Sequence, residues 1–267
     1  MSQLQQQAIY PGAELFLLKQ FMRREGIVPA QALLGTGLDE AQLSRAGSLV
    51  SSEQFDRIYR NLYRLAARAD FGLALGQALN LSRWGLLSAA LFSSKTLGDA
   101  LATANQLRVL LRSRFTLTAA MREGGYDIEV RKREGMEYPL NSVFAHEMLF
   151  TSLQVQIAQL LGREFYFTEI RLNYPPPPHA ADYERYFAAK VQFNSPVSGF
   201  CIDRDTMHQP LPLANPAAKQ QAMLVAEAEL KRVLQVQKGD IGWQVRALIQ
   251  GSEQRLALDD VAAGLNL

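Results

Sequence analysis

The chain has 267 residues, of which 48% are hydrophobic and 20% are charged, and this composition excludes global disorder. Its 28 lysines and arginines nearly balance 26 acidic residues, so the net charge of +2 excludes binding to nucleic acid by bulk positive charge. The single cysteine, Cys201, excludes an internal disulfide and favours a reducing compartment, so we expect a cytoplasmic protein. Neither a signal peptide nor an apolar run of about 18 residues is visible, and we expect no membrane segment.

The first hundred residues show helical periodicity almost throughout. A helix follows Pro11, and Ser51 or Ser52 is expected to cap a second one. Further helices are expected at 71–79 and 84–93. Thr96 and Asp99 have the spacing of a capping box, which predicts another helix over 100–112.

The hydrophobic period changes to two after Arg114. Alternation over 115–121 and 126–130, around a glycine turn, predicts an antiparallel hairpin. A helix is expected over 142–161, ended by Gly162, and strands at 165–174, 191–193 and 199–202. This order predicts an α+β fold, in which a helical N-terminal part packs with a mainly antiparallel or mixed sheet.

Residues 217–237 are predicted to form a connecting helix. Met223, Leu230 and Leu234 recur near heptad spacing, so this helix would dimerise or, equally well, pack against its own domain. Two short helices are expected at 243–249 and 258–265. The small residues Ala262 and Ala263 suit the corner of a helix-turn-helix unit, although a plain helical hairpin explains the same segment.

Motifs for catalysis, cofactors and metals fail at defined positions. His146-Glu147 begins like a zinc-protease helix, but Phe150 stands where the second histidine is required. No phosphate loop, complete dinucleotide loop or Gly-x-Ser-x-Gly motif occurs, and Cys201 lies in an apolar context that favours a structural thiol. We therefore expect no catalytic residue, no metal and no cofactor. An enzyme with a scattered active site stays a remote alternative without a supporting motif.

The segment Leu258-Asp259-Asp260-Val261-Ala262 resembles the first helix of the first helix-turn-helix in the AraC/XylS family of bacterial transcription regulators. The upstream chain is similar to the subgroup with an arabinose-binding-type N-terminal domain. This similarity lies in six segments that keep their order and spacing: 84–91, 94–101, 182–187, 191–193, 200–203 and 210–213.

The resemblance implies three parts. Residues 1–213 would form an effector-sensing domain, 214–238 a connecting or dimerisation helix, and 239–267 the incomplete N-terminal part of an all-α, AraC-type DNA-binding domain. Residues 240–267 carry two arginines against four acidic residues, the wrong sign for a phosphate-binding surface. We expect a C-terminally truncated chain without recognition helices, so that operator DNA would bind only to the complete protein.

The sensor is expected to bind a small-molecule effector of unknown class, in a homodimer that shifts its DNA-binding domains. Its pocket would lie between the helices at 84–93 and 99–112 and the sheet that starts at Phe115. Arg108 and Arg112, one helical turn apart, would face a carboxylate together, and Trp84, Tyr138 and His146 are further candidate lining residues. The alternative is a sensor domain that acts through protein contacts or dimerisation without a small molecule.

Overall fold

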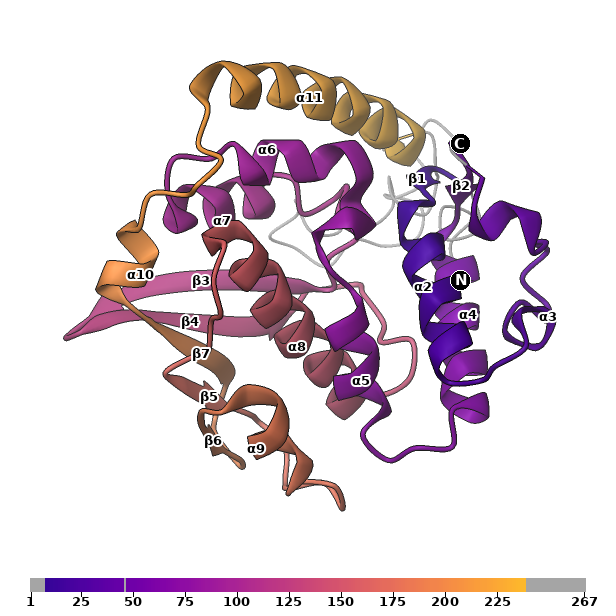
Figure 1. The fold of residues 1–267 in the computed structure, drawn as a ribbon, viewed down its shortest axis with the longest axis horizontal. Coiled ribbons are helices and arrows are strands. Elements are labelled where there is room, and N and C mark those ends of the chain that lie inside the picture. Colours follow the sequence, from indigo (N-terminus) through magenta and orange to yellow (C-terminus); the bar gives the residue numbers. More distant parts are fainter. Residues whose placement is uncertain (1–7, 46, 239–267) are drawn as a thin grey trace, which may run out of the picture.

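The computed structural model describes residues 8–45 and 47–238, and combines a helical N-terminal part with a five-stranded sheet (Figure 1). The predicted α+β class is confirmed, whereas the predicted helix-turn-helix segment lies outside the described residues. The N-terminal elements are β1 Tyr10–Pro11, α2 Ala13–Arg24, α3 Pro29–Ala32, η1 Ala41–Leu43, β2 Leu49–Val50, α4 Ser52–Leu65 and α5 Phe71–Ala78.

Helix α4 begins at the predicted cap. Ser51 Oγ accepts a hydrogen bond from the Gln54 amide (3.1 Å), and the Gln54 side chain accepts one from the Ser51 amide (2.8 Å). This capping box satisfies two amide groups that the first helical turn leaves without partners. The helix then buries Phe55, Ile58 and Leu62 on one face, against α2 and its neighbours.

The helix predicted over 84–93 is interrupted. A 3₁₀ segment, η2 (Leu81–Leu87), is followed by α6 (Ser88–Phe92), and the break lies at Gly85, whose φ of 54° and ψ of −128° are not helical. A side chain here would favour a regular helix, but glycine adopts this conformation at little steric cost. The periodicity of the flanking residues was insufficient to reveal the break.

The helix predicted to run to Arg112 is also shorter than expected. Helix α7 covers Leu97–Gln106, with the Thr96 side chain capping the Asp99 amide as predicted (3.2 Å). Turns then lead to Arg112, whose φ is 48°, so the prediction that Arg108 and Arg112 lie one helical turn apart is wrong. Arg112 forms a buried ion pair with Glu14, a long-range contact that local periodicity cannot register.

The sheet has the order β3-β4-β7-β5-β6. All neighbouring strands are antiparallel except β5 and β6, which are parallel, so the sheet is mixed but mainly antiparallel, as predicted. The strand expected over 165–174 shrinks to three residues. The strands are β3 Phe115–Arg122, β4 Gly125–Lys132, β5 Glu169–Arg171, β6 Lys190–Gln192 and β7 Ser198–Asp203.

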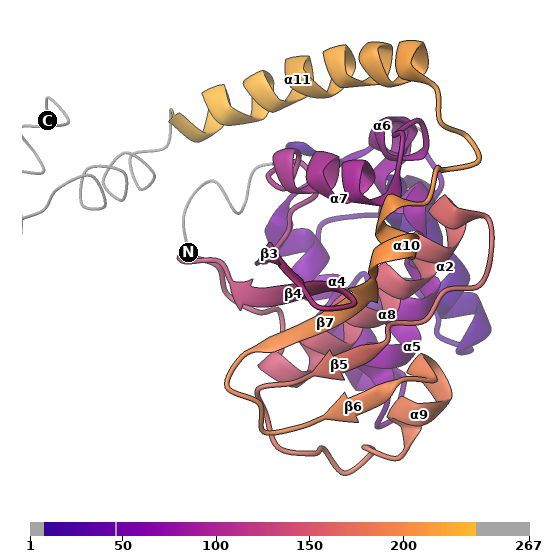
Figure 2. The same ribbon diagram turned by 90° about the vertical axis from the view of Figure 1, so that its left-hand side faces the viewer.

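Helix α8 (Ser142–Leu161) lies along one face of the sheet (Figure 2). Phe150 on the helix meets Phe200 on β7 at right angles, with ring centroids 5.7 Å apart. The helix ends at Gly162, whose left-handed conformation confirms the predicted stop. Its other side packs against α5, so α8 joins the sheet to the N-terminal helices.

The connecting helix α11 (Pro216–Lys238) lies across η2 and α6 (Figures 1 and 2). Ala226 and Val233 are completely buried, and Met223 and Leu230 are half-buried in the same hydrophobic cluster of this chain. Two shorter helices, α9 (Asp182–Phe187) and α10 (Arg204–His208), complete the described elements. Within the described part of the chain, no helix combines the length and the apolar character needed to cross a membrane.

Candidate functional site

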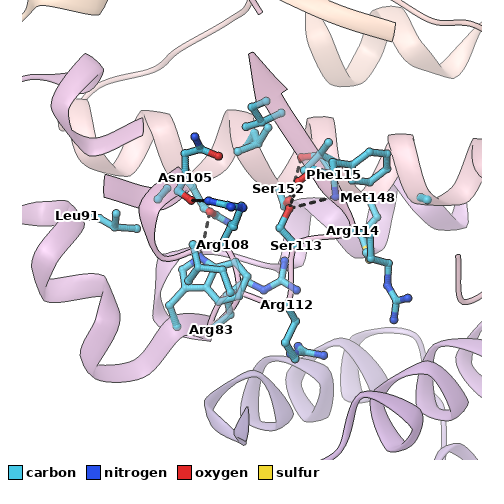
Figure 3. Close-up of a pocket in the computed structure, with 18 of the residues that line it drawn as sticks. Arg83, Leu91, Asn105, Arg108, Arg112, Ser113, Arg114, Phe115, Met148 and Ser152 are labelled. Carbon is cyan, nitrogen blue, oxygen red and sulfur yellow. Dashed lines mark hydrogen bonds between the residues drawn. The ribbon is translucent and has the colours of Figure 1, made fainter. Parts of the chain in front are cut away.

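A cavity of about 140 Å³ lies between η2, α7, the turns after α7, β3 and α8 (Figure 3). Its position is the one expected for the pocket from the sequence. Most of its wall is apolar. Helices, turns and a strand contribute the apolar lining residues, which are Trp84, Leu91, Ala104, Leu111, Phe115, Leu117, Ala145, Met148, Leu149 and Leu153.

Four arginines also line the cavity: Arg83, Arg108, Arg112 and Arg114. Arg108 and Arg112 lie in the turns after α7, and Arg114 directly precedes β3. Arg83 lies in η2 (Figure 3). Among the described residues, none that lines this cavity is acidic. The wall therefore joins a concentration of positive charge to a mainly apolar surface.

Two of these arginines share one buried carboxylate behind the wall. Glu14, 1% exposed in the first turn of α2, accepts hydrogen bonds through Oε2 from Arg83 Nη2 (2.8 Å) and Arg112 Nη2 (2.6 Å). The Tyr59 hydroxyl donates to its other oxygen. Burial by itself would raise the pKa of Glu14, but the charges of Arg83 and Arg112 outweigh burial and hold that pKa below its ordinary value.

The other two arginines differ in their partners. Arg114 pairs with Asp56 on α4. Arg108 is exposed, and within residues 8–45 and 47–238 its guanidinium donates one hydrogen bond, to the Asn105 carbonyl oxygen (3.1 Å). Burial, together with the positive charge of Arg108, lowers the pKa of nearby Arg133. Arg108 thus holds a positive charge at the cavity without a carboxylate partner among the described residues.

Polar side chains of Trp84, Gln156 and Ser152 in the cavity wall form hydrogen bonds within the protein. Trp84 Nε1 donates to Gln156 Oε1 (3.2 Å), and Gln156 Nε2 donates to the Leu79 carbonyl oxygen (3.0 Å). Ser152 Oγ donates to the Leu149 carbonyl oxygen (3.0 Å). The Arg83 guanidinium lies over the Trp84 ring, 4.4 Å from its centroid. These contacts hold the wall in one arrangement and leave few polar groups free for a ligand.

The model of the arabinose-binding N-terminal domain of AraC transcription regulators matches residues 26–211. The chain belongs to this family. The matched range contains all the cavity-lining residues, and the buried carboxylate of Glu14 lies just before it.

Named relatives of this AraC-family chain are transcription regulators. The ornithine utilization regulator of Pseudomonas aeruginosa is 32% identical over 185 residues, which are 69% of this chain and 54% of the relative. The regulator VqsM of the same organism is 22% identical over 200 residues, covering 73% and 60% of the two chains. The chain therefore spans little more than half the length of these curated relatives. What it shares with them is the N-terminal domain of AraC transcription regulators, and this family is not enzymatic, as the sequence predicted.

The fold also matches a solved regulator structure. The transcriptional regulator CdpR from Pseudomonas aeruginosa aligns with 95% of this chain and 75% of its own, with a TM-score of 0.59 and 20% sequence identity. At that identity the match establishes the shared fold alone.

Three of the five predicted effector-binding residues, Trp84, Arg108 and Arg112, line the cavity of this AraC-type domain. Tyr138 and His146 lie outside its lining, and both rings pack against Phe115, Tyr138 tilted at 5.5 Å and His146 edge-on at 4.9 Å between ring centroids. His146 is 2% exposed, and burial lowers its pKa. Whether any of the five binds an effector stays a prediction.

Sequence reasoning missed Glu14, Arg83 and Gln156. Glu14 carried a usable signal, because it lies one helical turn before Leu18 on the face of α2 that is otherwise apolar. A charged residue on a buried face needs a partner of opposite charge. Within the described ranges, no group of three or more histidines, cysteines or carboxylates is placed to hold a metal ion.

Proposed function

We propose that this regulator senses a small metabolite in the arginine-lined cavity and transmits its binding through α11 to a DNA-binding domain. The observation that carries the proposal is that the cavity and the hydrophobic cluster under α11 share a wall. Trp84 and Ala104 line the cavity and also pack against the cluster that buries Ala226 and Val233. Leu111 belongs to both sets.

This shared wall supplies a physical route for the signal. A ligand that moves Trp84 or Leu111 alters the surface on which α11 lies. The free energy of ligand binding then differs between the protein with α11 docked and the protein with α11 released. A coupling of about 1–3 kcal/mol suffices for a regulatory response. No covalent step is needed.

The remaining parts of the proposal follow the family. The DNA-binding domain would begin near residue 239, contact operator DNA through its helix-turn-helix units and act in the cytoplasm as part of a homodimer. For dimerisation we proposed Met223, Leu230 and Leu234 from their spacing. The first two face this chain's own cluster, so the outer face of α11, with Leu224 and Val225 exposed, offers a second contact surface.

That outer face also favours the alternative function, in which the domain is regulated by dimerisation or protein contacts and binds no small molecule. Leu224 is 63% and Val225 54% exposed on adjacent positions of α11. Such residues contribute to an interface when a partner covers them. Analytical ultracentrifugation of the chain, with Leu224→Asp as the variant, tests whether this face holds two copies together.

A thermal-shift screen tests metabolite sensing directly. The chain would be mixed with sugars, amino acids and small organic acids; ornithine belongs in the screen because a relative is named for its utilization. A concentration-dependent rise in Tm is expected for one class. In the control variant Leu149→Trp, an indole fills part of the cavity and abolishes the rise. If no class raises Tm, or if Leu149→Trp responds as the wild type does, metabolite sensing in this cavity is refuted.

A gel-shift assay tests the DNA-binding part. We expect operator DNA to be retarded by a chain that carries both helix-turn-helix units of the family. If such a chain leaves operator DNA unretarded, the proposed DNA-binding role is wrong.

A further inference from the structure

The charge in the wall of the cavity is unbalanced. Four arginines line it, and within residues 8–45 and 47–238 two carboxylates, Glu14 and Asp56, pair with them from behind. Two positive charges therefore remain in excess. A mainly apolar surrounding strengthens this field, because water screens charges less inside a partly closed cavity than at an open surface.

Arg108 is the arginine best placed to meet a ligand. Arg83 and Arg112 are committed to Glu14, and Arg114 is committed to Asp56. Among the residues that the structure describes, the Arg108 guanidinium donates one hydrogen bond, to the backbone oxygen of its neighbour Asn105, and in Figure 3 it lies near the Arg83 side of the cavity. A guanidinium presents a planar set of donors that fits the two oxygens of a carboxylate.

The rest of the wall limits what can accompany the carboxylate. Hydroxyl groups of a buried sugar would each require a polar partner, but Gln156, Ser152 and the Trp84 indole already donate to protein acceptors. Among the described lining residues, the Asn105 amide and the Arg108 guanidinium are the polar side chains with groups still free, and two such groups do not serve all the hydroxyls of a sugar. An ammonium group would meet four guanidinium groups and, among the lining residues that the structure describes, no carboxylate. The volume of about 140 Å³ is close to that of an engineered apolar cavity, roughly 150 Å³, that binds benzene.

We propose that the effector is a small carboxylate with a compact apolar body, its carboxylate bound by Arg108 and its body enclosed between α7, β3 and α8. This inference rests on the proposed function, since it assigns a chemical class to the ligand of the same cavity. It separates acids such as benzoate or hexanoate from sugars and from dibasic amino acids.

Isothermal titration of the 267-residue chain with benzoate and hexanoate tests the class. The matched neutral probes are benzamide and hexanamide, which keep the shape of each acid and lose its charge. Both acids are expected to bind, and each amide to bind at least about tenfold more weakly, because the neutral amide forms no ion pair with Arg108 and offers it one acceptor oxygen instead of two.

The variant Arg108→Gln tests the residue. Its affinity for the acids should fall by about 10- to 100-fold while its Tm stays close to that of the wild type, since Arg108 is exposed and makes no ion pair among the described residues. Arg131→Gln is the matched control. Arg131 is also exposed, pairs with Glu129 on β4, lies outside the cavity wall and should leave acid binding unchanged.

Each other outcome has a definite meaning. If the amides bind as tightly as the acids, or if Arg108→Gln binds the acids as the wild type does, the carboxylate class is wrong. If a sugar or a neutral compound binds instead, and Leu149→Trp abolishes that binding, metabolite sensing stands while the carboxylate class fails. If no compound binds in this cavity, both proposals fail together.

Discussion

At the scale of single residues, Glu14 is the carboxylate that holds the back of the cavity together. It lies 1% exposed between Arg83 and Arg112, so its removal leaves two guanidinium groups facing each other without their shared partner. We expect Glu14→Gln to lower the free energy of unfolding by about 3 kcal/mol, since breaking a buried ion pair from one side is strongly destabilising.

Urea unfolding measures this effect, and Glu53→Gln is its control. Glu53 forms a more exposed pair with Arg57 on α4, at 3.8 Å. Such surface pairs contribute little, so the control should change stability by less than about 0.5 kcal/mol. Equal losses in the two variants would show that the pair with Glu14 is no more important than one at the surface.

Asp70 provides a pH-dependent contribution at the start of α5. It accepts hydrogen bonds from Arg68 (2.7 and 2.9 Å), Arg185 (2.9 Å) and the Tyr186 hydroxyl (2.9 Å). The hydrogen bonds from Arg68 are the main cause that lowers the pKa of Asp70 from 3.8 to about 2. The carboxylate therefore stabilises the fold fully above pH 3.8, and this contribution is lost as the pH falls toward 2.

The variant Asp70→Asn should consequently be about 2 kcal/mol less stable than the wild type at pH 7, and the difference should shrink at pH 3. Urea unfolding at the two pH values measures it. Asp182→Asn removes a more exposed partner of Arg185 and serves as the control, with little change at either pH. A difference between Asp70→Asn and the wild type that is the same at both pH values would contradict the assignment.

At the scale of the elements, the contact between α5 and α8 depends on glycine. A Cβ atom at Gly76 would collide with Thr151 Oγ1 and lie 2.6 Å from the Met148 carbonyl oxygen. Because backbone atoms of α8 cannot move aside cheaply, Gly76→Ala should lower the free energy of unfolding by about 3 kcal/mol despite alanine's higher helix propensity. Gln77→Ala, at the next and exposed position, should leave stability nearly unchanged. Thermal or urea unfolding that ranks the two variants equally would contradict this close packing.

The attachment of α11 depends on two buried side chains, Ala226 and Val233. Val233→Asp places an unpaired carboxylate in the cluster that contains Leu107 and Leu110, so the helix should leave its seat while the sheet and α8 remain folded. Hydrogen exchange is expected to accelerate by at least about tenfold in peptides from α11 alone. Glu227→Gln, a conservative change at an exposed position of α11, should not change it. Equal protection of α11 in the wild type and Val233→Asp would show that the helix is held in another way.

The elements that sequence reasoning located well are those with local causes. Ser51 and Thr96 cap the first turns of α4 and α7, and Gly162 ends α8 in a left-handed conformation. These signals are visible in the sequence because caps and left-handed turns involve neighbouring residues. The hydrophobic period registers neither the break at Gly85 nor the early end of α7, after which Arg112 pairs with Glu14, 98 residues away. For the same reason, the location of the cavity and three of its lining residues could be predicted from the sequence. The ion pair between Glu14 and Arg83, which are 69 residues apart, could not.

At the scale of the whole molecule, one group of side chains stands between the cavity and α11. Leu111, Trp84 and Ala104 have one side toward the ligand space and the other toward the helix that leads to the predicted DNA-binding domain. The N-terminal strand adds a second connection. Tyr10 belongs to the cluster under α11 and lies beside the Arg112 guanidinium, 5.8 Å from the centroid of its ring, and Arg232 of α11 donates to the Ile9 carbonyl oxygen (2.7 Å).

This arrangement predicts reciprocal coupling between ligand and helix. If docking of α11 changes the affinity of the cavity for a carboxylate, the bound carboxylate must change the docking equilibrium of α11 by the same factor. Val233→Asp should therefore alter the Kd of benzoate by about 5- to 150-fold, and saturating benzoate should alter hydrogen exchange in wild-type α11 to a matching extent. Titration calorimetry and hydrogen exchange measure the two sides, with Glu227→Gln, at an exposed position of α11, as the control that should change neither. A Val233→Asp protein that binds benzoate with wild-type affinity would show that α11 does not transmit the signal, whatever the ligand does to the cavity.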